Sequence, residues 1–169
     1  GAVNVGNWNT FLGVSAGAVN ADGYNNTFSG YQSGYLNTSG FNNTFLGFGA
    51  GYSNVSGYNN TFVGLQAGLT ATGGTRNIFI GNLSGRYNTG SSNIFIGNWS
   101  GYYNTLGSSN TFIGRDAGMG TTNNAKSDNT AVGFRAGYGL DTGTGNVFLG
   151  YQSGYTTTGS NNIFLGYNA

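Results

Sequence analysis

The sequence is built from one five-residue word that recurs ten times. The word reads Asn, a β-branched residue, usually Phe, usually an aliphatic residue, and Gly, as in "NTFLG" (residues 9–13) and "NIFIG" (residues 77–81). The words end at Gly13, Gly30, Gly47, Gly64, Gly81, Gly97, Gly114, Gly133, Gly150 and Gly166. A nearly fixed period, here about 17 residues, indicates a stacked repeat architecture in which each repeat is one structural unit.

Glycine and β-branched residues decide which secondary structure the repeat can form. The residue after each Asn is Thr, Ile or Val in all ten words, which favours a strand over a helix. A second Gly stands four residues after each of the first nine, so a helix would be interrupted every few residues. We therefore predict an all-β fold: a parallel β-solenoid (β-roll) of about ten coils of ~17 residues, with two short strands per coil, forming a single domain over residues 1–169. With coils about 4.8 Å apart, the rod would be on the order of 48 Å long.

In a solenoid, equivalent residues of successive coils form a column along the rod. The Asn column is predicted to stand at the corner where each strand begins. Asn tolerates the left-handed backbone conformation, and stacked side-chain amides can hydrogen-bond from coil to coil. The members of this ladder are Asn9, Asn26, Asn43, Asn60, Asn77, Asn93, Asn110, Asn129, Asn146 and Asn162. The third residue after each word is always Ala or Ser, as at Ala16 and Ser33, which predicts an inward position where two sides of the coil come close.

The Phe column is the most informative for packing. Side chains alternate between faces along a strand, so Phe points one way and its two neighbours point the other. Two arrangements are open: Phe inside the coil against the Ala/Ser column, or the β-branched and aliphatic pair inside with Phe at an interface between chains. The many Thr residues in the pair favour the first, because buried hydroxyls need hydrogen-bond partners. The column consists of Phe11, Phe28, Phe45, Phe62, Phe79, Phe95, Phe112, Phe148 and Phe164.

Both faces of the predicted strand are largely apolar, whereas a thin solenoid has only one buried face. Strands with two apolar faces are usually covered on both. We therefore expect the protein's partner to be itself: a homo-oligomer in which the second face buries against another copy, as a trimer or a head-to-tail filament.

The period is broken once, at residues 119–133, "MGTTNNAKSDNTAVG". The interval from Gly114 to Gly133 is two residues longer than usual, Ala131 replaces Phe, and Lys126 is the one lysine of the chain. The interpretation is a bulged coil or surface loop, and a ligand site is the alternative.

The composition excludes several functional classes. Charged residues make up 5% of the chain and the net charge is +1, so no attraction to nucleic acid is expected. There is no His, Cys or Glu, which removes the usual general bases, thiolate nucleophiles and zinc ligands. We predict that the protein is not an enzyme and uses no metal or other cofactor. No apolar run approaches the length of a membrane-spanning helix, about 20 residues, so we expect no membrane insertion.

The repeat word is similar to words of a known family. "NTFLG", "NIFIG" and especially "NTAVG" (residues 129–133) resemble the head repeats of trimeric autotransporter adhesins, whose signature is Asn-Ser-Val-Ala-Ile-Gly. They are also similar to "NTALGYQAG"-type repeats of phage and bacterial tail-fibre-like proteins. The resemblance covers nearly the whole chain and implies a left-handed parallel β-roll, often trimeric, displayed outside a cell or virion with an adhesive or structural role. If the repeats correspond at their final Gly, it also implies the aliphatic pair inside the coil and Phe between chains.

The two ends of the sequence are in phase with each other. Joining Ala169 to Gly1 gives "FLGYNAGAVNVGNWNTFLG", in which Gly166 and Gly13 are separated by one ordinary repeat. We expect the sequence either to be an excerpt of a longer repeat protein or to stack head to tail with other copies through open strand edges.

The leading functional prediction is a structural protein: an extracellular fibre or an adhesin- or tail-fibre-like rod on a cell surface or virion appendage. The alternative is an adhesin module that binds surface glycans, because Tyr rings spaced along a rod can stack on sugars. The candidate rings are Tyr35, Tyr52, Tyr102, Tyr138 and Tyr155. A third alternative is ice binding, since Thr occupies six of the ten positions after Asn.

Overall fold

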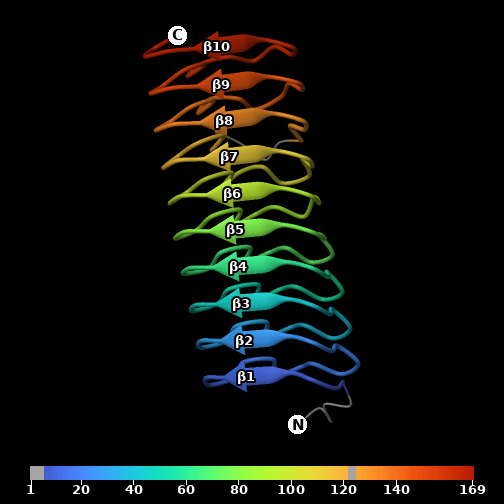
Figure 1. Ribbon diagram of the computed structural model, residues 1–169. Coiled ribbons are helices and arrows are strands. Elements are labelled where there is room, and N and C mark those ends of the chain that lie inside the picture. The colour runs from blue at the N-terminus through green and yellow to red at the C-terminus, as the bar shows by residue number, and fades with distance from the viewer. Residues whose placement is uncertain (1–5, 122–124) are drawn as a thin grey trace.

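The computed structural model describes residues 6–121 and 125–169, and within them the chain is a parallel β-solenoid. Each coil contributes one three-residue strand, and the strands stack in chain order into a single ten-stranded sheet (Figure 1). The strands are β1 (Thr10–Leu12), β2 (Thr27–Ser29), β3 (Thr44–Leu46), β4 (Thr61–Val63), β5 (Ile78–Ile80), β6 (Ile94–Ile96), β7 (Thr111–Ile113), β8 (Thr130–Val132), β9 (Val147–Leu149) and β10 (Ile163–Leu165). The prediction of a parallel solenoid with one coil per sequence repeat is confirmed.

Equivalent residues pair directly with one another. Phe11 lies opposite Phe28 across β1 and β2, and the same register holds through all ten strands, including those joined by a shorter or longer repeat. The extra or missing residues are therefore absorbed in the turns, and the columns read from the sequence are real columns in space.

The prediction of two strands per coil is wrong for the described residues, which contain one. The second half of the coil consists of turns, because left-handed residues interrupt the pleat; in the first coil these are Ser15 (φ 58°) and Gly17 (φ 57°). Its backbone still bonds to the next coil, since the Gly17 and Val19 N–H groups donate to Ser33 (2.9 Å) and Tyr35 (3.1 Å). The coil is thus hydrogen-bonded on both sides while only one side is a strand.

Two glycines per coil have separate steric causes, which the second coil illustrates. Gly30 ends the strand with φ 137°, and a Cβ there would lie 2.4 Å from the carbonyl oxygen of Gly47 in the next coil. Gly34 has φ 58°, and a Cβ there would lie 2.4 Å from the ring of Phe28. The first glycine allows the coils to approach, and the second makes room for the aromatic core.

The phenylalanines form that core. Seven of them, from Phe28 to Phe148, are fully buried, and Phe11 and Phe164 in the outermost coils are partly buried against them. From Phe11 to Phe112 the ring centroids are 4.7–5.0 Å apart and the planes within 12° of parallel. The interior arrangement favoured from the Thr content is the one observed. The packing implied by the adhesin resemblance, with the aliphatic pair inside and Phe between chains, is wrong here because those pairs point outward.

The Ala/Ser column is buried as predicted, from Ser33 to Ser153. Ser33 Oγ donates to the carbonyl oxygen of Phe45 in the next coil (3.1 Å), and Ser100 Oγ does the same to Phe112 (2.9 Å). Serine therefore fits this narrow interior where its hydroxyl can reach the strand above.

The Asn ladder runs along the corner before the strands. Its side-chain oxygen accepts from the backbone N–H of the next Asn, as between Asn26 and Asn9 (2.9 Å), and its Nδ2 donates to a glycine carbonyl, as from Asn26 to Gly40 (2.8 Å). The left-handed residue is the one before each ladder Asn, for example Asn25 (φ 55°), so the reason given for Asn from backbone conformation is wrong at this position. The buried amide instead hydrogen-bonds a backbone N–H group and a glycine carbonyl oxygen at the corner.

A second interior amide ladder, absent from the sequence-based predictions, lies seven residues after the strand glycines. Asn37 Nδ2 donates to Asn20 Oδ1 (2.7 Å), and Asn54 Nδ2 donates to Asn37 Oδ1 (2.8 Å). In the next coil the position is Ala71, and Asn54 Oδ1 has no hydrogen-bond partner among the described residues. The ladder therefore ends at a buried unpaired oxygen.

This termination gives a prediction for two matched substitutions. Asn37→Ala removes three hydrogen bonds, including the one from Asn54, whereas Asn54→Ala removes two together with the unpaired oxygen. We expect Asn37→Ala to lower the free energy of unfolding by about 1–2 kcal/mol more than Asn54→Ala, measured by chemical denaturation. Equal losses from the two variants would contradict the ladder.

Candidate functional site

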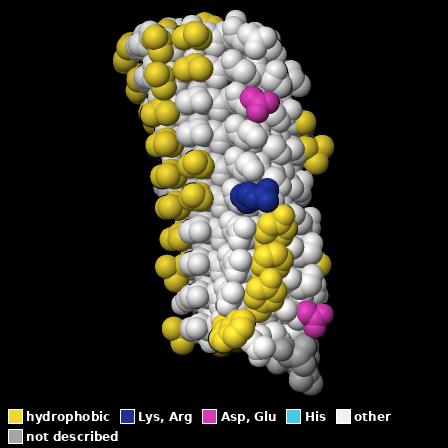
Figure 2. All heavy atoms as spheres, turned by 45° about the vertical axis from the view of Figure 1, so that its right-hand side comes forward, with side chains coloured by type: hydrophobic (Ala, Val, Ile, Leu, Met, Phe, Trp, Pro, Cys, Tyr) yellow, Lys and Arg dark blue, Asp and Glu magenta, His cyan; other side chains and the backbone are white. Residues whose placement is uncertain are grey.

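The outer face of the sheet runs along the rod as two columns of side chains. Each strand points its first and third residues outward, and neither of the two resulting columns contains a charged residue. Leu46, Ile80 and Leu149 in the third-residue column are 48%, 37% and 39% exposed. Figure 2 shows a row of hydrophobic side chains along the left of the molecule, and beside it a column that is partly hydrophobic and partly of other side chains. Ser29 is the one polar residue of the third-residue column.

A second exposed stripe precedes the strands in the N-terminal half. The rings of Tyr24, Phe41 and Tyr58 stack at 4.8–4.9 Å, and the Arg76 guanidinium lies 5.7 Å from the Tyr58 centroid. In Figure 2 this stripe occupies the lower half of the rod and ends at a basic side chain. The same column continues as hydroxyl residues, where the Thr75 and Ser91 N–H groups donate to Ser91 Oγ (3.1 Å) and Ser108 Oγ (3.0 Å). At the position two residues before each ladder Asn, the sequence changes from aromatic residues to Thr and Ser. This change is visible in the sequence, but the sequence-based predictions did not include it.

The predicted sugar-stacking tyrosines form two separate pairs and one isolated ring. Tyr35 stacks on Tyr52 at 5.1 Å and Tyr138 on Tyr155 at 4.9 Å. Tyr102 is buried and meets Tyr87 and Tyr103 edge-on. The five rings therefore do not form one continuous platform.

The irregular region places a lysine in the core. Residues 122–124 of the predicted irregular coil lie outside the described residues, but Lys126 takes the column position held by Gly107 and Gly143 in neighbouring coils. Its side chain is fully buried, with Nζ donating to the carbonyl oxygen of Leu140 (2.6 Å) and lying 5.7 Å from the Phe112 ring centroid. It lies in the coil whose core Phe is replaced by Ala131.

Phe148 also adjusts to that replacement. A Cβ placed on Gly137 would lie 2.8 Å from the Phe148 ring, and one on Gly154 would lie 2.1 Å from it. The ring therefore contacts the core glycines of two coils, whereas Phe28 lies against Gly34 of its own coil. The Phe148 ring thus occupies part of the space left by Ala131.

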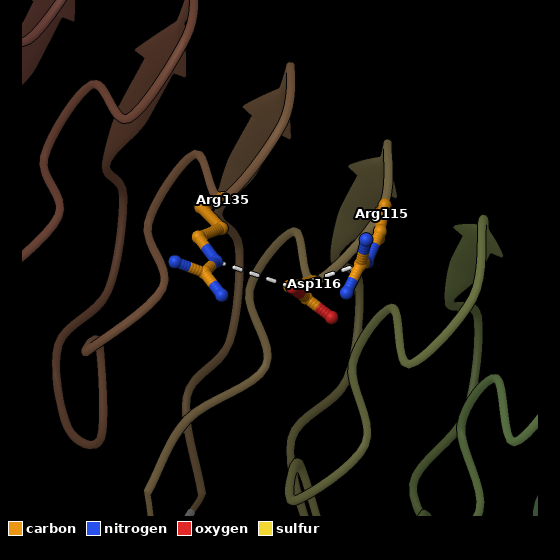
Figure 3. A network of polar contacts seen from close by, with 3 residues as sticks. All are labelled: Arg115, Asp116 and Arg135. Atoms are coloured by element: carbon orange, nitrogen blue, oxygen red, sulfur yellow. Dashed lines mark hydrogen bonds and ion pairs between the residues drawn. The ribbon is translucent and has the colours of Figure 1, made fainter.

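One carboxylate links two arginines on the surface. Asp116 Oδ2 accepts from Arg135 Nε at 3.2 Å and lies 3.6 Å from Arg115 Nε (Figure 3). Arg135 belongs to the next coil, so the network ties neighbouring coils together. Each arginine also lies over the Phe134 ring, at 5.8 Å from Arg115 and 5.0 Å from Arg135. The one carboxylate is shared between the two arginines, so the cluster keeps a net positive charge, and the Arg115 side chain is exposed.

In residues 6–121 and 125–169 no group of three or more His, Cys, Asp or Glu side chains could hold a metal ion. The described part of the chain also has no helix long and apolar enough to span a membrane. Comparison with models of protein families, with curated proteins and with solved structures found no match. The geometry of the rod is therefore the basis for the functional proposals.

The buried lysine makes stability depend on pH. Burial lowers the pKa of Lys126 to about 7, because the ammonium loses its hydration, and the nearby Asp141 carboxylate opposes this in part. Between that value and the pKa of about 10.4 in the unfolded chain, the unfolded state binds a proton that the folded state does not. The free energy of unfolding should therefore rise with pH in this window and stay at its lower level below pH 7.

We expect a gain of about 2 kcal/mol between pH 7 and pH 9, measured by chemical denaturation. Lys126→Met keeps an unbranched side chain of similar length and should remove this slope. The same slope in wild type and variant would show that Lys126 is not its source.

Proposed function

We propose that the chain is a non-enzymatic structural rod of an extracellular fibre, or of an adhesin- or tail-fibre-like appendage. In this proposal coils continue end to end and rods associate side by side, so that the partner is another copy of the same chain. The extracellular location follows from the resemblance of the repeat word to adhesin and tail-fibre repeats.

The observation that carries the proposal is the uninterrupted stack. Ten strands pair in one register and the corner amides repeat with them, while the core rings repeat in every coil except the one that carries Ala131. Stacked parallel ladders of like residues give unusual resistance to unfolding. The function that such a molecule supports directly is to hold a fixed length and a fixed surface.

The ends of the sheet support growth along the axis. Within the described residues, β1 and β10 each pair on one edge only, and Phe11 and Phe164 are less buried than the rings between them. Open strand edges recruit further strands. A further coil, whether of the same polypeptide or of another copy, would complete both the ladder and the burial of these rings.

The sheet face supports lateral association. Ten strands about 4.8 Å apart, each about 10 Å long, give a face of roughly 480 Å². A stable pair usually buries about 800 Å² per partner, so single-length rods should associate weakly and rods extended end to end should associate firmly. Lateral packing is therefore coupled to axial growth.

The test combines negative-stain electron microscopy with sedimentation equilibrium of the purified chain. We expect elongated particles or filaments and a mass that increases with concentration. Monomers at every concentration, with no elongated species, would overturn the proposal.

A charged variant tests the sheet face in particular. Ile80→Lys with Ile96→Lys places two charges on the outer face without touching the core, and should leave single rods while abolishing lateral bundles. The control is Ser39→Lys with Ser56→Lys, which adds the same charge at exposed positions away from the sheet and should leave bundling unchanged. Bundles that persist in the first variant would assign lateral contact to another surface.

Ice binding is the second candidate for the same face. The observation that favours it is that the Thr residues of the first strand position all point outward on one sheet, in a column with the coil spacing. Thermal hysteresis measured on the wild type and lost in the Ile80→Lys, Ile96→Lys variant would support it. No hysteresis in the wild type removes it and leaves the structural proposal untouched.

A further inference from the structure

A hollow of about 300 Å³ lies in the flank of the rod, on the turn side of the third and fourth coils. Its lining consists of Phe48, Gly49, Tyr52 and Ser53 of the third coil, Gln66, Leu69 and Thr70 of the fourth, and Gln32 of the second. We call the two rings its walls and the two glutamines, which belong to the coils on either side of Gly49, its ends. Because Gln32 and Gln66 are equivalent residues two coils apart, their backbones are about 10 Å from each other. Along the rod axis, the hollow thus extends about one coil spacing to each side of Gly49.

The hollow exists because one side chain is missing from a column. Two residues after the strand glycine, the other coils carry Ser15, Gln32, Gln66, Leu83, Trp99, Asp116, Arg135, Gln152 and Asn168. All of these have φ between 51° and 62°, and Gly49 has φ 60°. The left-handed backbone at this position therefore accommodates large residues elsewhere and does not by itself require glycine.

Packing does not require glycine at this position either. A Cβ on Gly49 would meet only Gln66 Cγ at 3.5 Å and Leu69 Cδ1 at 3.6 Å, which are ordinary contacts. Two residues later, a Cβ on Gly51 would lie 2.5 Å from the ring of Phe45. Gly51 is thus needed by the core, whereas the effect of Gly49 is to leave space open at the surface.

The walls are held in place by stacking. Phe48 is 48% exposed and its ring stacks on Tyr31 at 5.1 Å. The Tyr52 ring stacks on Tyr35 at the same distance. Two aromatic rings are held by neighbours in the preceding coil. Because these rings are already ordered in the free protein, binding a ligand against them costs little further side-chain conformational entropy.

The ends supply polar groups that are not otherwise engaged. Neither the Gln32 nor the Gln66 side-chain amide hydrogen-bonds to another described residue. Each amide offers two N–H donors and one carbonyl acceptor. None of the residues that line the hollow is charged.

We propose that this hollow is a binding subsite for one neutral pyranose ring of a glycan. A pyranose presents C–H groups on its faces and hydroxyl groups around its edge, which match aromatic sides and amide ends. The volume stands at the lower limit of small-molecule sites and suits a single ring. A phosphate, sulfate or uronate would find no cation in the lining. The site belongs to one rod and does not require the fibre described above.

The proposal is tested by saturation-transfer NMR on the intact chain, with the methyl pyranosides of glucose, galactose, mannose and N-acetylglucosamine as probes. We expect transfer to the ring protons of at least one of them. An array of neutral oligosaccharides ending in the same sugars then distinguishes a polymer-borne ring from a free monosaccharide.

The decisive variant is Gly49→Gln, which restores the residue found at the equivalent positions of Gln32, Gln66 and Gln152 and fills the hollow. We expect the affinity of this variant for the responding sugar to fall about tenfold or more. The new side chain would displace the pyranose ring, which would lose at least one hydrogen bond to each of the two glutamine amides. Phe48→Leu removes one aromatic wall without filling the space and should weaken binding as well. Asn168→Gln is the control, because it places the same side chain at the same column position in another coil without filling this hollow or opening a new one, and it should leave binding unchanged.

Circular dichroism and the unfolding midpoint establish that each variant is folded. No transfer to any of the four sugars, or equal transfer in the wild type, Gly49→Gln and Phe48→Leu proteins, would overturn the proposal. Filament formation by the same samples is read separately, so failure of the sugar site and failure of the structural role are distinguishable.

Discussion

The structure depends on one constraint: each coil hydrogen-bonds to and packs against the next coil in a fixed register, so that equivalent residues lie directly above one another. A three-residue strand is far too short to be stable alone, and the solenoid gains stability only from repetition. The stack turns a weak local preference into long columns in which rings lie on rings and amides bond to amides. Two left-handed residues other than glycine in a typical coil, such as Asn25 and Gln32, cost backbone strain that the contacts between coils offset.

Much of the fold could be predicted from the sequence, because the stacking of equivalent residues appears there as a regular repetition of residue types. The β-branched residue after each Asn, the regular glycines and the nearly constant period were sufficient for a parallel solenoid. The Thr residues beside Phe favoured its position inside the coil but left the other arrangement open, and the resemblance to adhesin repeats implied that other arrangement. The sequence was less informative about the second half of the coil, because a turn that is hydrogen-bonded to its neighbours has the same period as a strand. Only the dihedral angles of residues such as Ser15 and Gly17 distinguish the two.

The features that sequence reasoning missed are those in which one column differs from its neighbours. The second amide ladder, the stack from Tyr24 to Tyr58 and the hollow at Gly49 each depend on what stands directly above and below a residue. Glycine at residue 49 could not be distinguished from the other glycines of a chain that has 34 of them. Three facts show that the effect of Gly49 is to leave space open. The backbone conformation at this position accommodates a side chain, the packing leaves room for a side chain, and the other coils carry a side chain there. Lys126 was noticed in the sequence, but its burial could not be foreseen, because the sequence does not show whether the side chain turns into the coil or out to solvent.

The direction of the hydrogen bonds has a mechanical consequence. In a solenoid the bonds between coils run along the rod axis, so a force that separates the two ends loads them in tension and detaches one coil after another. Each detached coil exchanges about 4.8 Å of rod for about 55–60 Å of extended chain. A tether built in this way would behave as a spring that lengthens in steps and absorbs work at every step, without any covalent bond breaking.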